Sequence, residues 1–89
     1  MMRVKLLGSA ITLNATPSTI NNATEVLIVH DAGGNAGRIL TLTESDGTTT
    51  VGTMIVNPGF QIVIRKHADQ KLKISTGTDV TATPVSYQS

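Results

Sequence analysis

The residues best suited to acid–base or metal chemistry are two histidine–carboxylate pairs, His30-Asp31 and His67-Ala68-Asp69. Both pairs are predicted to lie at strand ends, where their loops could meet. A metal or catalytic centre needs several such groups converging in one pocket, and the chain has no cysteine to add to them. We therefore interpret the pairs as solvated polar loops, and we expect no metal, no cofactor and no enzymatic activity.

The segment 32–37, Ala-Gly-Gly-Asn-Ala-Gly, has the glycine content of a phosphate-binding loop. Phosphate loops work because a following helix N-terminus directs backbone N–H groups at the anion. Residues 38–44 instead alternate leucine with threonine, like a strand, and no Gly-Lys-Ser/Thr motif is present. The chain also lacks the Gly-x-Ser-x-Gly pattern of a nucleophile elbow. The segment is therefore predicted to be a mobile hairpin loop.

Positive charge is concentrated in one stretch of the chain, Arg65, Lys66, His67, Lys71 and Lys73. The net charge is only +1, and no aromatic residue lies within the stretch to stack on a base, so we expect no binding to nucleic acid. The residues are typical of a solvated edge, where lysine and arginine also discourage unwanted strand pairing. The functional interpretation is a rim that meets an acidic surface on a partner protein.

Length and composition favour one small domain, residues 1–89, that gains stability by oligomerisation. A chain this short buries only about 60–65% of its extended-chain surface. Disulfides are excluded because there is no cysteine. The apolar run near the start ends at Gly8, too early for a secretion signal, and no stretch is long enough to cross a membrane. We therefore expect neither secretion by a signal peptide nor membrane contact.

Fourteen threonines and a predominance of valine, isoleucine and leucine favour strands over helices. Short alternating runs separated by turn signals predict an all-β fold, a small antiparallel β-sandwich or barrel of about seven or eight short strands. Residues 26–29 are all apolar, so either both faces of that strand are covered or one face meets a partner subunit. Val26 and Ile28 are therefore added to the predicted partner interface.

Several turns have specific signals. Asp46-Gly47 suits a hairpin with a type I′ turn, and Gly52 is a possible bulge in the returning strand. The loop 14–24 is expected to cross between sheets or to pack along an edge, with Ile20 as its apolar anchor. Pro84 lies inside the last strand, which is therefore expected at an edge or a bulge.

The densest apolar stretch is 51–66, which Asn57-Pro58-Gly59 divides in two. Pro-Gly suits a type II turn. Type I and II turns splay the strands of a hairpin. We therefore predict a corner at which the chain changes sheets. Phe60, just after it, is expected in the core. Because Phe60 and Tyr87 are the only aromatic residues, a glycan-binding surface is less well supported.

The stretches 57–66 (Asn-Pro-Gly-Phe-Gln-Ile-Val-Ile-Arg-Lys) and 80–87 (Val-Thr-Ala-Thr-Pro-Val-Ser-Tyr), with the opening Met-Arg-Val-Lys-Leu-Leu-Gly, resemble small structural proteins of tailed bacteriophages, especially cyanophages. The resemblance is a loose pattern spread over most of the chain. It implies an all-β protein of the virion that decorates or cements the capsid, with the major capsid protein or other virion proteins as partners. It also implies a homo-oligomer on a symmetric lattice, with a trimer favoured.

Two alternatives stay open at this point. The first is a component of the phage neck, tail or fibre, which would be present in far fewer copies than a decoration protein. The second is a small β-sandwich module that binds a glycan or another ligand.

Overall fold

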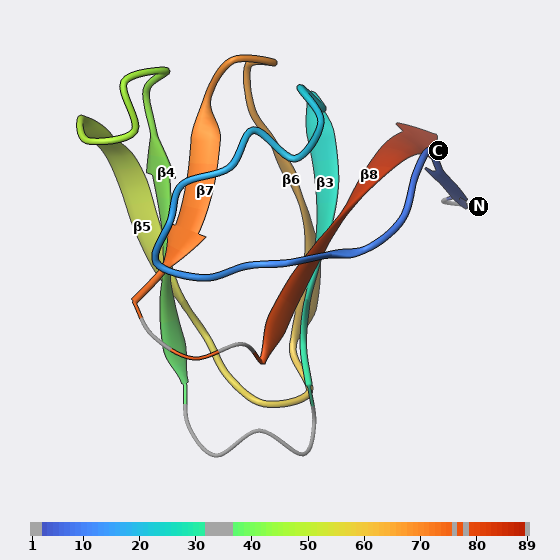
Figure 1. The fold of residues 1–89 in the computed structure, drawn as a ribbon. Helices are drawn as coiled ribbons and strands as arrows, with labels where there is room; N and C mark the ends of the chain where they lie inside the picture. The colour runs from blue at the N-terminus through green and yellow to red at the C-terminus, as the bar shows by residue number, and fades with distance from the viewer. Residues whose placement is uncertain (1–2, 32–36, 76, 78, 89) are drawn as a thin grey trace.

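The computed structural model describes residues 3–31, 37–75, 77 and 79–88, and these residues form two antiparallel sheets (Figure 1). The prediction of an all-β fold of short strands is confirmed. No helix occurs in the described part of the chain, so none there is long and apolar enough to cross a membrane. The eight strands are β1 (Arg3–Leu6), β2 (Ile11–Thr12), β3 (Glu25–His30), β4 (Arg38–Thr43), β5 (Thr50–Val56), β6 (Gln61–Arg65), β7 (Lys71–Ile74) and β8 (Val80–Gln88).

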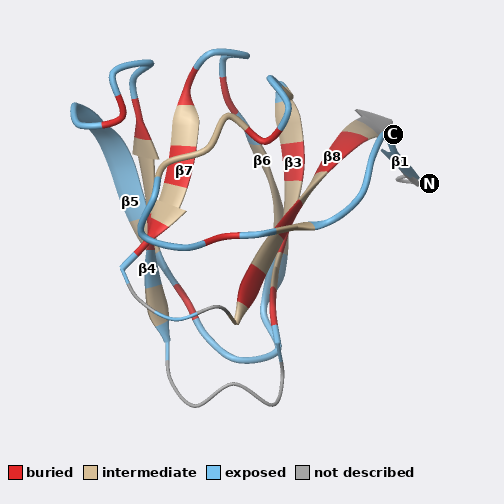
Figure 2. Ribbon diagram, viewed as in Figure 1, coloured by how far each residue is buried: buried red, intermediate tan, exposed pale blue. Residues whose placement is uncertain are grey.

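The larger sheet has the order β1-β8-β3-β6, with β2 also paired to β8, and the smaller sheet has the order β5-β4-β7. Of the consecutive described strands, only β4 and β5 form a hairpin. All the remaining connections after β3 pass from one sheet to the other. Side chains from both sheets meet in one core. Figure 2 colours the buried residues red along the ribbon. Its fully buried members are Leu13, Ile20, Val26, Ile28, Leu40, Val56, Leu72, Ile74, Val80 and Ala82.

The loop 14–24 closes one side of this sandwich. Leu13 N donates to Val80 O of β8 at 2.8 Å, and one residue later Asn14 O accepts from Ile74 N of β7 at 3.0 Å. Ser18 then forms two backbone hydrogen bonds with Leu72, also on β7. The chain therefore passes from one sheet to the other and covers the free edge of β7, as predicted for this loop. Ile20, its predicted anchor, is fully buried.

The Asn57-Pro58-Gly59 corner joins β5 in the smaller sheet to β6 in the larger sheet. Phe60 N donates to Asn57 O at 3.0 Å, and Gly59 has a φ of 82°, as a type II turn requires. Both the turn and the change of sheet are confirmed. The expectation that Phe60 lies in the core is wrong, because its side chain is 38% exposed beside the turn.

The hairpin between β4 and β5 contains a bulge one residue from the predicted position at Gly52, and its turn is not of the predicted type. Leu42 pairs with Gly52 and Thr43 with Thr50, so Val51 is the extra residue. At the tip, Gly47 has a φ of 76°, whereas Asp46 does not have a positive φ. A type I′ turn needs a positive φ at both residues. The carboxylate of Asp46 instead accepts hydrogen bonds from the backbone of Thr48 and Thr49.

Pro84 lies in β8, which is an inner strand of the larger sheet, and not at an edge or a bulge. Its carbonyl accepts from Leu7 N at 2.8 Å. The N–H and C=O of one strand residue point to the same side. The N–H that proline lacks would therefore point at the stretch where β1 has ended and β2 has not begun. The gap between β1 and β2 on the neighbouring side of β8 therefore accommodates the proline, although β8 is not an edge strand.

The expectation that Val26 and Ile28 meet a partner is wrong for this structure, because both side chains are fully buried in the core. The opposite face of β3 carries Leu27 and Val29, which are only partly buried. The glycine-rich segment after β3 lies mostly outside the described residues. Its flanking strands β3 and β4 belong to different sheets and do not pair with each other.

Candidate functional site

The side of the sandwich opposite the loop 14–24 is open, and two edge strands border the opening. Among the described strands, β5 pairs only with β4, and β6 pairs only with β3. We call the space between β5 and β6 the seam. Strand pairing is interrupted there, and both bordering edges are unpaired among the described strands, so the seam is a candidate for a contact with another molecule.

Hydrogen bonding shows which backbone groups face the seam. His30 N donates to Phe60 O and Lys66 N donates to Thr24 O, both at 2.9 Å, so residues 60, 62, 64 and 66 face β3. Since successive residues alternate in direction, the backbone groups of Gln61, Val63 and Arg65 face the free edge of β6.

The hydrogen bonds of β4 show which backbone groups of β5 face outward. Ser75 N donates to Ile39 O at 3.0 Å, so Ile39 faces β7 while Leu40 and Leu42 face β5. Their partners on β5, Met54 and Gly52, therefore face β4. The backbone groups of Thr53 and Ile55 are left facing the free edge of β5.

Between the two edges lies an open groove with apolar walls and a polar mouth. Its wider part has a volume of about 610 Å³ and is bordered by Leu42 and Val51, together with Arg65, His67 and Gln70. A smaller hollow of about 210 Å³ shares Leu42 and Arg65 with it and is lined mainly by aliphatic side chains. Those side chains are Leu40, Leu42, Met54, Ile64 and Leu72. A groove of this kind suits an apolar segment better than a small polar substrate.

The turn 66–70 forms the mouth of the groove, and Lys66 is built into it. The Lys66 side chain is only 5% exposed, and its Nζ donates to His67 O and Ala68 O, each at 3.2 Å. Burial lowers the pKa of Lys66 below the usual lysine range, and the nearby Asp69 carboxylate opposes this effect. Lys66 therefore fixes the turn and is not available to a partner as a free cation, which corrects its predicted interface role.

Gln70 ties the same turn to the β4–β5 hairpin. Its Oε1 accepts from His67 N at 2.8 Å, and its Nε2 donates to Glu44 Oε1 at 3.0 Å. Thr43, which is fully buried, donates from its hydroxyl to the carbonyl oxygens of Glu44 and Lys71. The two loops that border the wide end of the seam are therefore fixed to each other by polar contacts.

The predicted basic surface is divided by the fold. Arg65 is exposed at the mouth of the seam, opposite Glu25 on β3. Lys71 and Lys73 alternate with the buried Leu72 and Ile74, so they lie on the outer face of the smaller sheet. The structure therefore does not bring Arg65, Lys71 and Lys73 into one patch, and of the three only Arg65 borders the groove and remains a candidate contact residue.

The two histidine–carboxylate pairs lie at opposite ends of β3 and β6, and their loops do not meet. His30 ends β3 near Phe60, whereas His67 follows β6 near Thr24. His30 is also fully buried rather than solvated, with Nδ1 at 2.9 Å from Asp31 O. In the described part of the chain, no group of three or more histidine and carboxylate side chains could hold a metal ion.

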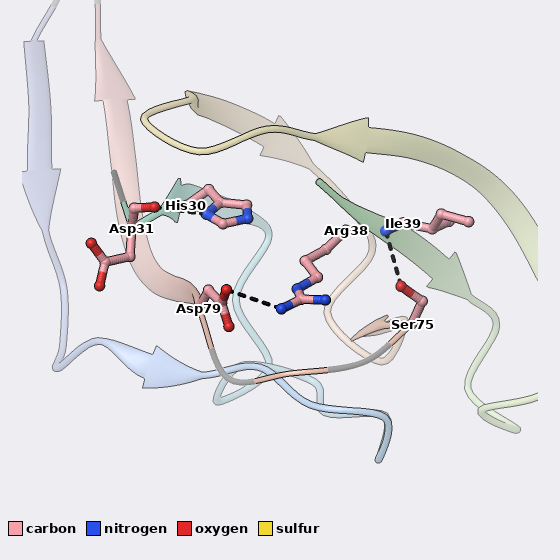
Figure 3. A network of polar contacts seen from close by, with 6 residues as sticks. All are labelled: His30, Asp31, Arg38, Ile39, Ser75 and Asp79. Carbon is pink, nitrogen blue, oxygen red and sulfur yellow. Dashed lines mark hydrogen bonds and ion pairs between the residues drawn. The ribbon is translucent and has the colours of Figure 1, made fainter. Parts of the chain in front are cut away.

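The polar network around His30 has a structural role (Figure 3). Asp31 N donates to Asp79 O at 2.8 Å, and the Asp79 carboxylate pairs with Arg38 at 3.1 Å. Ser75 Oγ accepts from Ile39 N at 3.2 Å. These contacts connect the end of β3 and the start of β8 to the start of β4, and so hold the two sheets together at the end opposite the mouth of the seam.

Sequence reasoning missed the importance of β5 and of Gln70. The residues of β5, Thr50–Val56, include no charged side chain, and this was visible in the sequence. Gln70 carries no such signal, because its role depends on a contact with Glu44, 26 residues away.

Comparison of the chain with known protein families, with curated proteins and with solved structures finds no significant match.

Proposed function

We propose that this chain is a non-enzymatic structural protein of a phage virion, which decorates the assembled capsid and stabilises it. The single observation that supports a binding role is the open seam, where two unpaired strand edges flank an apolar groove. Such an edge is a ready template for another chain. The placement in a virion rests on the sequence resemblance described above.

Arg65 is the exposed cation at the mouth of the seam, and an acidic surface on a capsid protein would complement it. A contact of this kind would add buried interface between neighbouring shell subunits. The outer lysines offer a matched comparison, because Lys73 is basic but lies on the other face of the smaller sheet.

The test is the binding of the purified chain to phage particles that lack it, followed by quantitative mass spectrometry and calorimetry of the particles. We expect hundreds of copies per particle and a higher melting temperature of the shell. Arg65→Glu should reduce occupancy, whereas Lys73→Glu should leave it unchanged. An unchanged shell-melting temperature would contradict stabilisation, and a copy number of a few dozen or fewer would favour a neck or tail component.

A further inference from the structure

Among the described residues, the strand β5 is an edge without the usual protection against pairing. Native edges are commonly protected by lysine, proline, charged side chains or a covering segment. In this fold the segment 14–18 covers β7, β6 ends in Arg65, and β1 contains Arg3 and Lys5. The residues of β5 include no charge and no proline, and most of the strand is exposed (Figure 2).

The exposed edge combines unpaired backbone groups with apolar side chains. Thr53 and Ile55 direct their N–H and C=O groups away from β4. The Ile55 side chain is 65% exposed, and Ile39, its cross-strand partner on the outer face, is 48% exposed. One additional strand would pair with these backbone groups and would also cover the exposed isoleucine side chains.

We propose that this additional strand is β5 of a second copy of the chain, paired antiparallel about a two-fold axis. A two-fold contact brings the residues next to the axis close to their own counterparts, so a charged residue there would lie near an identical charge. Because β5 has no charged side chain, it meets this condition, whereas β6 would bring two copies of Arg65 into its interface.

The free backbone groups determine the register of this pairing. When the axis passes at Met54, Thr53 of each copy lies opposite Ile55 of the other, and both pairs exchange backbone hydrogen bonds. The bulge at Val51 and the corner at Asn57 limit regular pairing on either side. The two smaller sheets would become one continuous sheet, and the edge of β6 with Arg65 would stay free for another chain.

This inference rests on the proposal that the protein acts through contacts with other chains, but its test needs no phage particle. On the proposed axis, Met54 of one copy lies opposite Met54 of the other, and these two residues exchange no backbone hydrogen bonds. Side chains of antiparallel strands are closest in such pairs. Since the chain contains no cysteine, Met54→Cys should form a covalent dimer on mild oxidation. Val63→Cys, on the free edge of β6, is the matched control and should crosslink at least about tenfold more slowly.

Sedimentation equilibrium of the purified chain gives the second measurement. We expect a concentration-dependent dimer, and Ile55→Lys should raise its dissociation constant at least about tenfold, because it places lysines beside the axis. Val63→Lys should leave the constant unchanged, and circular dichroism checks that both variants keep the fold. A wild-type chain that stays monomeric at high concentration, or equal crosslinking of the two cysteine variants, would overturn the inference. An oligomer lost on Val63→Lys would also overturn it in favour of pairing between β5 and β6.

Discussion

Arg38 Nη2 lies 3.1 Å from Asp79 Oδ2, and this ion pair joins the first residue of β4 to the residue before β8, in the other sheet. Both side chains are mostly buried, with 16% and 17% of their surface exposed. Water therefore screens the pair less than it screens a typical surface salt bridge. The contact connects segments that are 41 residues apart in the chain.

Removal of either charge should lower the free energy of unfolding. We expect about 1–2 kcal/mol for Arg38→Met and for Asp79→Asn, because each leaves its partner partly buried without its counter-ion. The double variant should lose less than the sum of the two, with a coupling of about 1 kcal/mol. Urea unfolding of the four proteins measures this cycle. Additive losses would show that the two charges do not interact.

Gly77 should not tolerate alanine. Its φ of 84° favours glycine, and a Cβ there would lie 2.8 Å from Arg38 Cζ and 2.9 Å from Asp79 Oδ1. Gly77→Ala should therefore destabilise the fold by about 2 kcal/mol, about half of it from the backbone conformation alone. In an Arg38→Ala background, the cost of Gly77→Ala should fall, because one of the two clashes is removed. Thermal unfolding checks this, and an equal cost in both backgrounds would contradict the close approach.

Ile20, Asn21 and Asn22 all have positive φ, between 53° and 58°, and Ile20 is fully buried. A β-branched residue in this conformation is strained, so its burial must compensate for the backbone cost. Ile20→Ala should destabilise the protein by about 3 kcal/mol. The exposed Asn22→Gly is the matched control, and it should be neutral or slightly stabilising because glycine accepts positive φ. Chemical denaturation compares the two; a neutral Ile20→Ala would contradict its anchoring role.

Asp46 should make the hairpin sensitive to acid. Hydrogen bonds from the Thr49 hydroxyl and from the backbone N–H groups of Thr49 and Thr48 hold the pKa of Asp46 well below its usual range. A carboxylate with a lowered pKa in the folded state stabilises the protein above the unfolded pKa of about 4, and the effect is lost as the pH falls below it.

Asp46→Ala should accordingly lower the melting temperature at pH 7, and its difference from the wild type should shrink as the pH falls from about 4 to 2. Asp46→Asn keeps an oxygen acceptor without the charge, so its melting temperature at pH 7 should lie between those of the wild type and Asp46→Ala. Melting temperatures over this pH range provide the measurement. A wild-type-to-alanine difference that does not change with pH would contradict the role of the charge.

Much of the local structure followed from the sequence because its determinants are local. Alternation of apolar and polar residues located the strands, Pro58-Gly59 located the corner, and Gly52 located the bulge to within one residue. Ile20 was identified as an anchor because it is the only large apolar residue in a polar loop. Each of these features depends on the conformational preferences of a few neighbouring residues.

The candidate site was only partly predictable, because strand pairing between distant segments decides which side chains share a surface. Lys66 and His30 are polar residues that were expected at the surface, but the crossing of the chain between sheets buries both. Pro84 was expected at an edge, but the gap between β1 and β2 admits it into an inner strand. The basic residues that are close in sequence are separated because β6 and β7 belong to different sheets.

The sequence by itself determined an all-β chain with its main turns and its uncharged strand at Thr50–Val56. Only the tertiary structure decided that this strand is an edge, that β6 lies across the seam from it, and that an apolar groove separates them. The physical reason is that a strand's own residues determine its conformation, whereas its neighbours are determined by the lowest free energy of packing two whole sheets around one core.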